Sequence, residues 1–219
     1  MKKDIKITII DYDNGNLESV YRACDYVGMT PKISSSQSEI NQSDAIILPG
    51  VGAFGDAMKS LKERNLIDPI YSFIKTGKIV VGICLGMQLF LNKSEESGEE
   101  NGLGLIEGEC MHFSKFFEKK NNKVPQIQWN TIYSENKINF KETSPFSSIK
   151  QNEFMFFVHS FFVKTKNKND ILALSKYGNI EYCSALQKDN IIGMQFHPEK
   201  SGPKGIEIYD NIKNIIIKN

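Results

Sequence analysis

One cysteine stands in a setting that could make it a nucleophile. Cys84 lies in the run GICLG (82–86), directly after the apolar stretch 79–83 and before a helical pattern. A strand, a sharp turn with flanking glycines and a helix start form the nucleophile elbow of G-x-S-x-G hydrolases, here with cysteine in place of serine. Free N–H groups at the helix start favour the thiolate, and the N–H of Leu85 is placed to donate to an oxyanion. The alternative is a buried core cysteine beside glycines that let a helix pack closely.

A cysteine nucleophile needs a base, and one histidine is accompanied by a carboxylate. His197 and Glu199 are two residues apart at the end of the apolar stretch 191–196. Strand alternation would point both side chains to the same side, so that the carboxylate orients the imidazole as the third member of a triad. The alternative is a surface pair at a strand end. His159, inside the run FMFFVHSFFV (154–163), is either a satisfied core histidine or a residue that lines a pocket.

The segment PGVG (49–52) is a candidate for the remaining catalytic element. It follows the apolar stretch 45–48, and its glycines would let the chain turn backbone N–H groups inward, giving an oxyanion donor near Val51 or Gly52. The alternative is a plain turn between a strand and a helix. Because open α/β sheets bind ligands at the carboxyl ends of their strands, we expect this segment to meet Cys84 in one crevice.

Alternating strand and helix signals in the first half define the fold class. Apolar stretches at 5–10, 45–48 and 79–83 are separated by helical spacing over 17–27 and 54–74. Such strands predict a mostly parallel sheet that helices cover on both faces. In the second half we expect strands at 154–163, 171–175, 182–187 and 191–196 and a helix at 206–217. Their short turns indicate an antiparallel extension, so we expect an α/β fold and a single domain over residues 1–219.

Composition excludes several classes of function. Lys plus Arg is 27 and Asp plus Glu is 26, a net charge of +1, which lacks the basic footprint of a nucleic-acid binder. The apolar run near the start is interrupted by Lys6 and Thr8, too polar for a signal-peptide core, and no stretch approaches the ~20 apolar residues of a membrane span. The four cysteines are far apart, which favours neither a metal site nor disulfides. We therefore expect a cytoplasmic protein with no metal.

Three motifs carry a resemblance to a known family. The segments PGVGAFG (49–55), GICLGMQLF (82–90) and QFHPEKS (195–201) together resemble the class I, or triad-type, glutamine amidotransferases. Within that family the chain is most similar to the glutaminase subunits of imidazole glycerol phosphate synthases. That similarity runs nearly end to end, through DYDNGNLESV (11–20), GLGLIEGE (102–109), VPQIQWN (124–130) and FFVHSFF (156–162).

The resemblance implies a reaction and a role for each matching residue. Cys84 would attack the side-chain amide of glutamine, with His197 and Glu199 completing the triad. Ammonia would leave first, a glutamyl thioester on Cys84 would then be hydrolysed, and no cofactor is needed. The resemblance assigns the oxyanion to Val51, Gly52 and Leu85, glutamine binding to Gln88, Glu96, His159, Ser160 and Phe161, and partner contacts to Asn14, Trp129 and Asn130.

The resemblance also implies a partner. Ammonia would pass along a sequestered path to a (β/α)₈ cyclase subunit, in a heterodimer that makes imidazole glycerol phosphate in histidine biosynthesis. One segment departs from the family: its usual P-H-x-G-W-N pattern reads PQIQWN here, with Gln126 and Gln128 in place of histidine and glycine. Gln128 removes the conformational freedom of glycine. The departure leaves open a different synthase, such as a sugar-amidating enzyme of surface glycan synthesis.

Two alternative functions remain: a binding subunit without activity, and a hydrolase that works without a partner. A catalytically silent binding subunit would not need an intact Cys84, His197 and Glu199, which all stand in this chain. A free-standing cysteine hydrolase of the same fold would hydrolyse its substrate regardless of any partner. Labelling of Cys84 by a glutamine-analogue electrophile would exclude the silent binding subunit. Hydrolysis that requires a partner would exclude the free-standing hydrolase.

Overall fold

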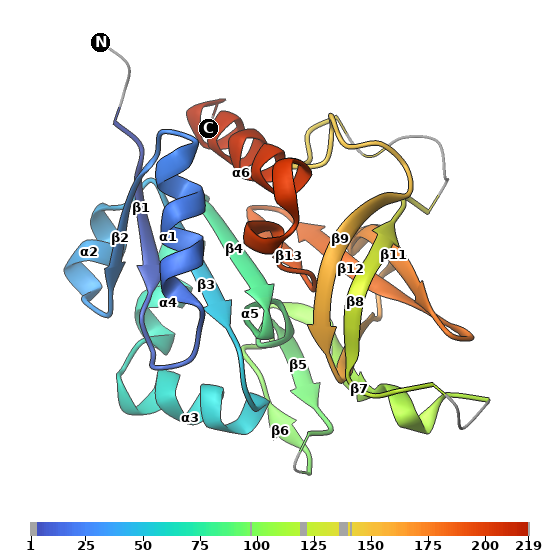
Figure 1. Cartoon of the computed structure of the whole chain (residues 1–219). Coiled ribbons are helices and arrows are strands. Elements are labelled where there is room, and N and C mark those ends of the chain that lie inside the picture. Colours follow the sequence, from blue (N-terminus) through green and yellow to red (C-terminus); the bar gives the residue numbers. More distant parts are fainter. Residues whose placement is uncertain (1–3, 97, 119–121, 136–139, 141, 219) are drawn as a thin grey trace.

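A long central sheet organises the chain (Figure 1). The computed structural model describes residues 4–96, 98–118, 122–135, 140 and 142–218. Within them, eleven strands form one sheet in the order β2-β1-β3-β4-β13-β12-β10-β7-β5-β6, with β11 paired to β12. The parallel half contains β1 (Lys6–Ile10), β2 (Thr30–Ser34), β3 (Ala45–Gly50), β4 (Ile79–Cys84) and β13 (Ile191–Met194). This confirms the α/β class and the mostly parallel sheet.

The antiparallel extension begins where β12 pairs with β13. Apart from one parallel pair, β5 with β7, its neighbours run in opposite directions. Its strands are β5 (Leu91–Ser94), β6 (Glu100–Asn101), β7 (Ile106–His112), β10 (Phe161–Thr165), β11 (Ile171–Tyr177) and β12 (Ile180–Lys188). The predicted extension is therefore confirmed, although the sequence patterns did not indicate β5, β6 or β7.

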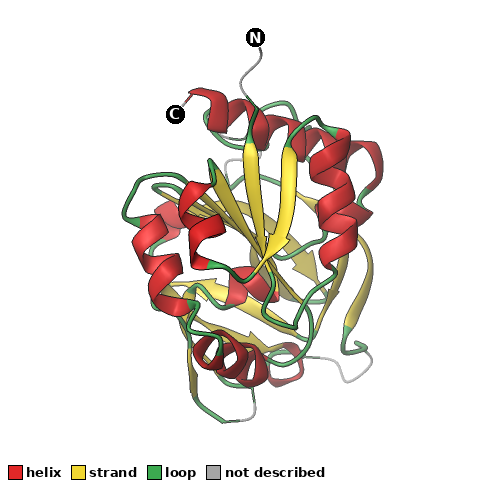
Figure 2. Ribbon diagram, turned by 90° about the vertical axis from the view of Figure 1, so that its left-hand side faces the viewer, coloured by secondary structure: helices red, strands yellow, loops and turns green. Residues whose placement is uncertain are grey.

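Strand alternation divides the apolar residues of the parallel half between two cores. In β3, Ala45 and Ile47 enter one core, and Ile46 and Leu48 enter the other. The first core lies under α1 (Leu17–Tyr26) and α6 (Gly202–Lys218), and the second under α2 (Gln37–Gln42), α3 (Phe54–Glu63) and α4 (Ile67–Ile74). Helices thus cover both faces of the sheet, as Figure 2 shows. A strand buried on both faces must be apolar at every position, which explains the unbroken runs at 45–48 and 79–83.

The apolar run 154–163 was predicted as one buried strand, and this prediction is wrong. The run forms two strands, β9 (Glu153–His159) and β10, which part at Ser160. β9 pairs with β8 (Gln126–Ile132) in a separate two-stranded ribbon, whereas β10 joins the main sheet. One face of the ribbon is open to solvent, so Phe154 is 56% exposed. Continuous hydrophobicity does not reveal a change of sheet, because both strands are apolar.

Other differences concern short elements. The helix after Cys84 is one turn, α5 (Leu85–Gln88), because the chain turns into β5 three residues later. Three 3₁₀ turns, η1 (Phe113–Lys115), η2 (Lys168–Asp170) and η3 (Pro198–Lys200), were not predicted. β2 escaped prediction because it is a polar edge strand that tolerates Pro31. In the described part of the chain, no helix has the length and apolar character that crossing a bilayer requires.

Candidate active site

Cys84 is held in a strained turn at the end of β4. Its backbone has φ 55° and ψ −110°, a combination that a non-glycine residue adopts only when the surroundings impose it. The side chain is 6% exposed and borders a pocket of about 250 Å³. The predicted elbow is therefore present. α5 is a single turn and therefore has no long helix dipole. The groups at this helix start that can stabilise a thiolate are the backbone N–H groups of its first residues.

The glycines that flank Cys84 serve close packing. A Cβ on Gly86 would lie 1.8 Å from the carbonyl oxygen of Leu48, and a Cβ on Gly82 would lie 2.5 Å from the ring of Phe90. The left-handed turn itself falls on Cys84, not on either glycine. The strand–turn–helix shape of the motif is as predicted, but its glycines are not needed for the sharp turn. They are needed because the one-turn helix α5 packs directly against β3.

His197 and Glu199 form a buried pair beside the pocket. Nδ1 of His197 lies 2.7 Å from Oε1 of Glu199, and the two side chains are 3% and 1% exposed. Strand alternation predicts both residues on one strand, but β13 ends at Met194 and Glu199 lies in the 3₁₀ turn η3. The pairing is therefore confirmed and its predicted cause, strand alternation, is wrong. The Oγ of Ser201 donates to the carbonyl of His197 at 2.7 Å and fixes this turn.

Charges around His197 favour its protonated form. Burial lowers its pKa, but the neighbouring Cys84 and the Glu199 carboxylate outweigh burial and raise the pKa of His197 above the ordinary value of 6.5. The Nε2 atom has no hydrogen-bond partner among the described residues. An imidazolium paired with a carboxylate on one side, and a sulfur able to carry negative charge nearby, are suited to move a proton between sulfur and substrate.

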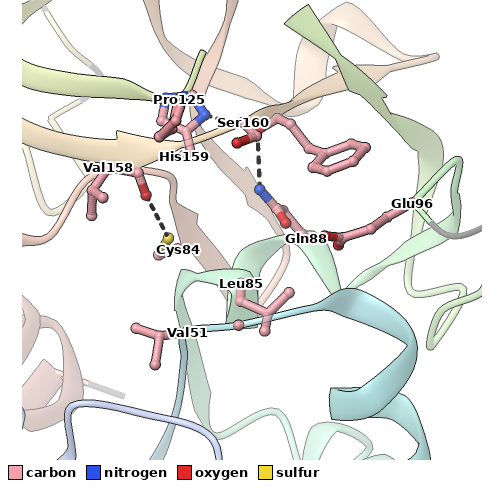
Figure 3. A pocket seen from close by; sticks show the side chains of 11 residues that line it. Val51, Cys84, Leu85, Gln88, Glu96, Pro125, Val158, His159 and Ser160 are labelled. Atoms are coloured by element: carbon pink, nitrogen blue, oxygen red, sulfur yellow. Dashed lines mark hydrogen bonds between the residues drawn. The ribbon is translucent and has the colours of Figure 1, made fainter.

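The pocket gathers most of the residues that the sequence analysis assigned to it. The predicted triad contributes Cys84 alone to its wall, while His197 and Glu199 lie outside the lining. Figure 3 shows Val158 and Val51 on opposite sides of the sulfur. The lining residues are Val51, Gly52, Cys84, Leu85, Gln88, Glu96, Pro125, Val158, His159, Ser160 and Phe161.

Gln88 presents a hydrogen-bond acceptor to the pocket. Its Nε2 donates to the carbonyl of Phe161 at 3.1 Å and to Oε1 of Gln195 at 3.0 Å. Both amide N–H bonds are thereby used, which leaves the Oε1 atom of Gln88 to accept from a ligand. An acceptor suits the –NH₂ of a carboxamide and repels a carboxylate.

Glu96 supplies a negative charge at the same pocket. Its Oε2 accepts from the backbone N–H of Phe54, the first residue of α3, at 2.8 Å. This contact leaves Oε1 able to meet a cation, and Figure 3 shows Glu96 reaching towards Gln88. An ammonium group and a carboxamide are both present in glutamine, and this pair of side chains matches that combination.

His159 is a neutral histidine in the wall of the pocket. Burial lowers its pKa to about 4, and Nδ1 lies 2.8 Å from the carbonyl of Phe161, so Nδ1 carries the proton. Nε2 lies 3.4 Å from the hydroxyl of Tyr182, whose own donor contact is Oε1 of Gln126 at 3.0 Å. His159 is therefore both a buried, hydrogen-bonded histidine and a residue that lines the pocket. Gln126 is fully buried in this network.

The candidate oxyanion segment lies against the elbow. Leu85, Val51 and Gly52 all line the pocket, and Gly52 has a φ of 101°, which favours glycine. The buried hydroxyl of Tyr12 donates to the carbonyl of Pro49 at 2.6 Å and holds the segment from below. The backbone of this segment and the first residue of α5 thus border the same pocket as Cys84, which is the placement that an oxyanion site requires.

The residues expected to contact a partner lie apart from the pocket lining. Trp129 is 49% exposed on the open face of the β8–β9 ribbon. Asn130 is turned towards β11, where its Nδ2 donates to the carbonyl of Lys176 at 2.9 Å. Asn14 donates to the carbonyl of Tyr12 and to Oγ of Ser60, both at 3.2 Å.

Sequence reasoning missed two groups at the sulfur. The Nε2 of Gln195 lies 3.7 Å from Sγ of Cys84, and the carbonyl of Val158 lies 3.8 Å from it. Gln195 stands in the same segment as His197, and a polar residue at the end of an apolar strand was a signal for it. A backbone carbonyl such as that of Val158 has no sequence signature.

Comparison with known proteins agrees with this fold and site. The family model "Glutamine amidotransferase class-I" matches residues 8–214, and the chain belongs to this family. The fold is shared with a structure of PurLQS from Thermotoga maritima, with a TM-score of 0.72 at 16% identity over 99% of each chain.

Curated relatives place the chain within the family. It is 41% identical over 210 residues to the imidazole glycerol phosphate synthase subunit HisH of Wolinella succinogenes, covering 95% of this chain and 99% of that protein. It is 42% identical over 209 residues to the subunit of the same name from Listeria monocytogenes, covering 95% of each. Within the class I glutamine amidotransferases, the chain therefore groups with the HisH subunits.

Proposed function

We propose that this chain is the glutaminase subunit of an imidazole glycerol phosphate synthase. It hydrolyses glutamine to glutamate and ammonia and passes the ammonia to a cyclase subunit in histidine biosynthesis. The observation that carries the proposal is the buried His197–Glu199 pair, 2.7 Å apart, beside Cys84 at the pocket. Full-length similarity to HisH subunits supports the histidine pathway over a sugar-amidating synthase.

The catalytic steps use the triad Cys84, His197 and Glu199. The Cys84 thiolate attacks the carboxamide carbon of glutamine, and the N–H groups of Leu85 and of Val51 or Gly52 stabilise the oxyanion. His197 gives its proton to the departing nitrogen, so the C–N bond breaks, ammonia leaves and a glutamyl thioester remains on Cys84. His197 then takes a proton from water, which attacks the thioester and releases glutamate and the thiolate. Glu199 holds the imidazole in position throughout.

Substrate binding uses the charges and dipoles that line the pocket. The Oε1 of Gln88 accepts from the glutamine side-chain amide, and Glu96 pairs with the α-ammonium group. His159, Ser160 and Phe161, where β9 passes into β10, form the segment along which glutamine lies. Because burial keeps His159 neutral, this residue adds no positive charge to the pocket that binds the substrate's ammonium group.

The partner is a (β/α)₈ cyclase subunit that covers the mouth of the pocket in a heterodimer. Three large apolar side chains on the open face of the ribbon, Ile127, Trp129 and Phe154, are 60%, 49% and 56% exposed, and Val51 at the pocket is 43% exposed. Exposed apolar groups around a pocket favour a protein partner, and aromatic residues dominate binding at such surfaces. A dry path through this contact would keep ammonia unprotonated, and Asn14 and Asn130 hold the neighbouring backbone segments.

The catalytic unit is a single domain over residues 1–219 that works in the cytoplasm without a cofactor. The purified complex with the cyclase subunit tests the proposal through two assays, synthesis from glutamine and synthesis from added ammonia. Cys84→Ala abolishes the first and spares the second, because the two reactions occupy different sites. Cys183→Ala, a buried cysteine of β12 away from the pocket, is the matched control and keeps both. Loss of both activities in a folded Cys84→Ala complex, or no stimulation of glutamine turnover by the cyclase, would contradict the proposal.

A further inference from the structure

A line of buried amides leads from the wall of the pocket to the sulfur of Cys84. The carbonyl of Phe161 accepts from Gln88 at 3.1 Å, Gln88 donates to Oε1 of Gln195 at 3.0 Å, and Nε2 of Gln195 lies 3.7 Å from Sγ. Gln88 is 5% exposed and Gln195 is fully buried. The backbone N–H of Gln195 donates to the carbonyl of Ser184 at 2.9 Å, which fixes the residue directly after β13. Gln195, in the middle of the line, is thus shielded from water, whereas Gln88 and Cys84 border the pocket.

The first acceptor fixes the direction of every hydrogen bond in this line. A backbone carbonyl only accepts, so the group of Gln88 that faces Phe161 must be its –NH₂. The second N–H of Gln88 then requires an oxygen on Gln195. Gln195 must therefore turn its own –NH₂ towards the sulfur. The N–H that faces Cys84 is a consequence of the network and not of an arbitrary choice of amide orientation.

Two groups at the sulfur have opposite effects on its charge. The carbonyl of Val158, 3.8 Å from Sγ, accepts from the thiol and repels the thiolate. The N–H of Gln195 stabilises the thiolate, because hydrogen bonds to ionised groups are stronger than those between neutral ones. Other ionisable groups near the sulfur are His197 and Tyr12, with Glu96 and His159 in the pocket wall. Tyr12 stays neutral because burial raises its pKa, and burial lowers that of His159.

We infer that Gln195 is a positioning residue for the nucleophile: its side-chain N–H holds the Cys84 sulfur in place and stabilises it as the thiolate. Without that donor, the carbonyl of Val158, which favours the thiol, would remain close to Sγ. The inference rests on the proposed function in taking Cys84 as the nucleophile. According to this inference, a residue outside the triad, Gln195, influences the fraction of Cys84 that is present as the thiolate.

The test measures the pH dependence of Cys84 alkylation by iodoacetamide, which reacts with the thiolate. Burial raises the pKa of the other three thiols, Cys24, Cys110 and Cys183, so Cys84 is the reactive one, and mass spectrometry of its peptide follows the reaction. In Gln195→Met, which keeps the length of the side chain and removes its N–H, the midpoint of the profile shifts upward by about one pH unit. The matched control Gln187→Met, on β12 and outside the pocket lining, leaves the midpoint unchanged. A native midpoint in folded Gln195→Met would overturn the inference.

A second measurement needs no change at Gln195. In the native chain, the side-chain amide resonance of Gln195 in ¹⁵N–¹H spectra is expected to shift with pH at the midpoint of alkylation. In Cys84→Ala that titration disappears. A Gln195 amide that does not respond to the ionisation of Cys84 would overturn the inference even if Gln195→Met failed to fold. Neither experiment uses glutamine or the cyclase, so a shifted midpoint without any glutamine turnover would refute the proposed function and leave the role of Gln195 intact.

Discussion

Nδ1 of His197 lies 2.7 Å from Oε1 of Glu199, with both side chains almost fully buried. The other oxygen of Glu199, Oε2, has no hydrogen-bond partner among the described residues. The carboxylate is therefore committed to a single partner, the imidazole. A carboxylate in this position favours one ring tautomer and stabilises the imidazolium during catalysis.

Glu199→Gln tests the role of that carboxylate. The amide oxygen can still accept from Nδ1, so the fold is retained, but the negative charge that stabilises the imidazolium is lost. We expect kcat for glutamine hydrolysis to fall by about 10²-fold or more, and by less than in Cys84→Ala, because orienting the base is secondary to nucleophilic attack. Steady-state kinetics of the complex give both values. Equal losses in the two variants would contradict this order.

Glu96→Gln tests the negative charge at the pocket. The amide oxygen can keep the contact with the N–H of Phe54, while the charge that meets the α-ammonium of glutamine is removed. We expect KM for glutamine to rise by roughly tenfold or more with a smaller change in kcat, since the interaction is the same in ground and transition states. Glu99→Gln, whose carboxylate pairs with Lys93 at the surface, is the control and leaves KM unchanged. A fall in kcat at constant KM would assign Glu96 to the chemistry instead.

His159→Asn tests the buried neutral histidine through the pH dependence of stability. Burial lowers the pKa of His159 from 6.5 to about 4, so the unfolded chain binds more protons than the folded chain between these pH values. The free energy of unfolding therefore decreases as pH falls from 6.5 towards 4, by up to about 3 kcal/mol from this residue. Urea unfolding at a series of pH values measures the slope, which becomes shallower in His159→Asn. Parallel slopes for the two proteins would show that His159 titrates normally.

Trp129→Ala tests the open face of the β8–β9 ribbon. The indole is 49% exposed and packs edge-on against Phe156, with ring centroids 6.1 Å apart, so its loss removes a large apolar group without opening the core. We expect the cyclase subunit to bind about tenfold more weakly or worse, as for aromatic hot spots. Titration calorimetry measures the affinity. Tyr26→Ala, on α1 and 80% exposed, is the matched control with unchanged affinity, and equal effects of both variants would remove the ribbon from the interface.

Sequence patterns predicted the structure correctly where burial alone determines which residue type each position needs. The unbroken apolar runs of β3 and β4 are required by burial on both faces, so their place at the centre of a parallel sheet was predictable. Cys84 and the PGVG segment were found because they directly follow those apolar runs, at the carboxyl ends of the strands. Prediction failed at Ser160, where one apolar run passes from the ribbon to the main sheet, because local hydrophobicity does not specify which strand a neighbour pairs with.

The site was predicted in its members more than in its geometry. The residues that line the pocket could be named from their motifs, whereas the cause of the His197–Glu199 contact, a 3₁₀ turn, could not. The role of Gln195 depends on hydrogen bonds to Gln88 and Cys84, which are 107 and 111 residues away along the chain. Contacts of that range are set by the assembled sheet, which no local pattern encodes.

The central claim is that Cys84 forms a covalent bond to the glutamyl group of glutamine. The most direct measurement is mass spectrometry of the complex with the cyclase, quenched in acid during turnover and digested. We predict a glutamyl adduct on the peptide that carries Cys84, absent from the Cys84→Ala complex and from samples given glutamate in place of glutamine. Glutamine turnover that persists in Cys84→Ala, or an adduct on another residue, would contradict the account.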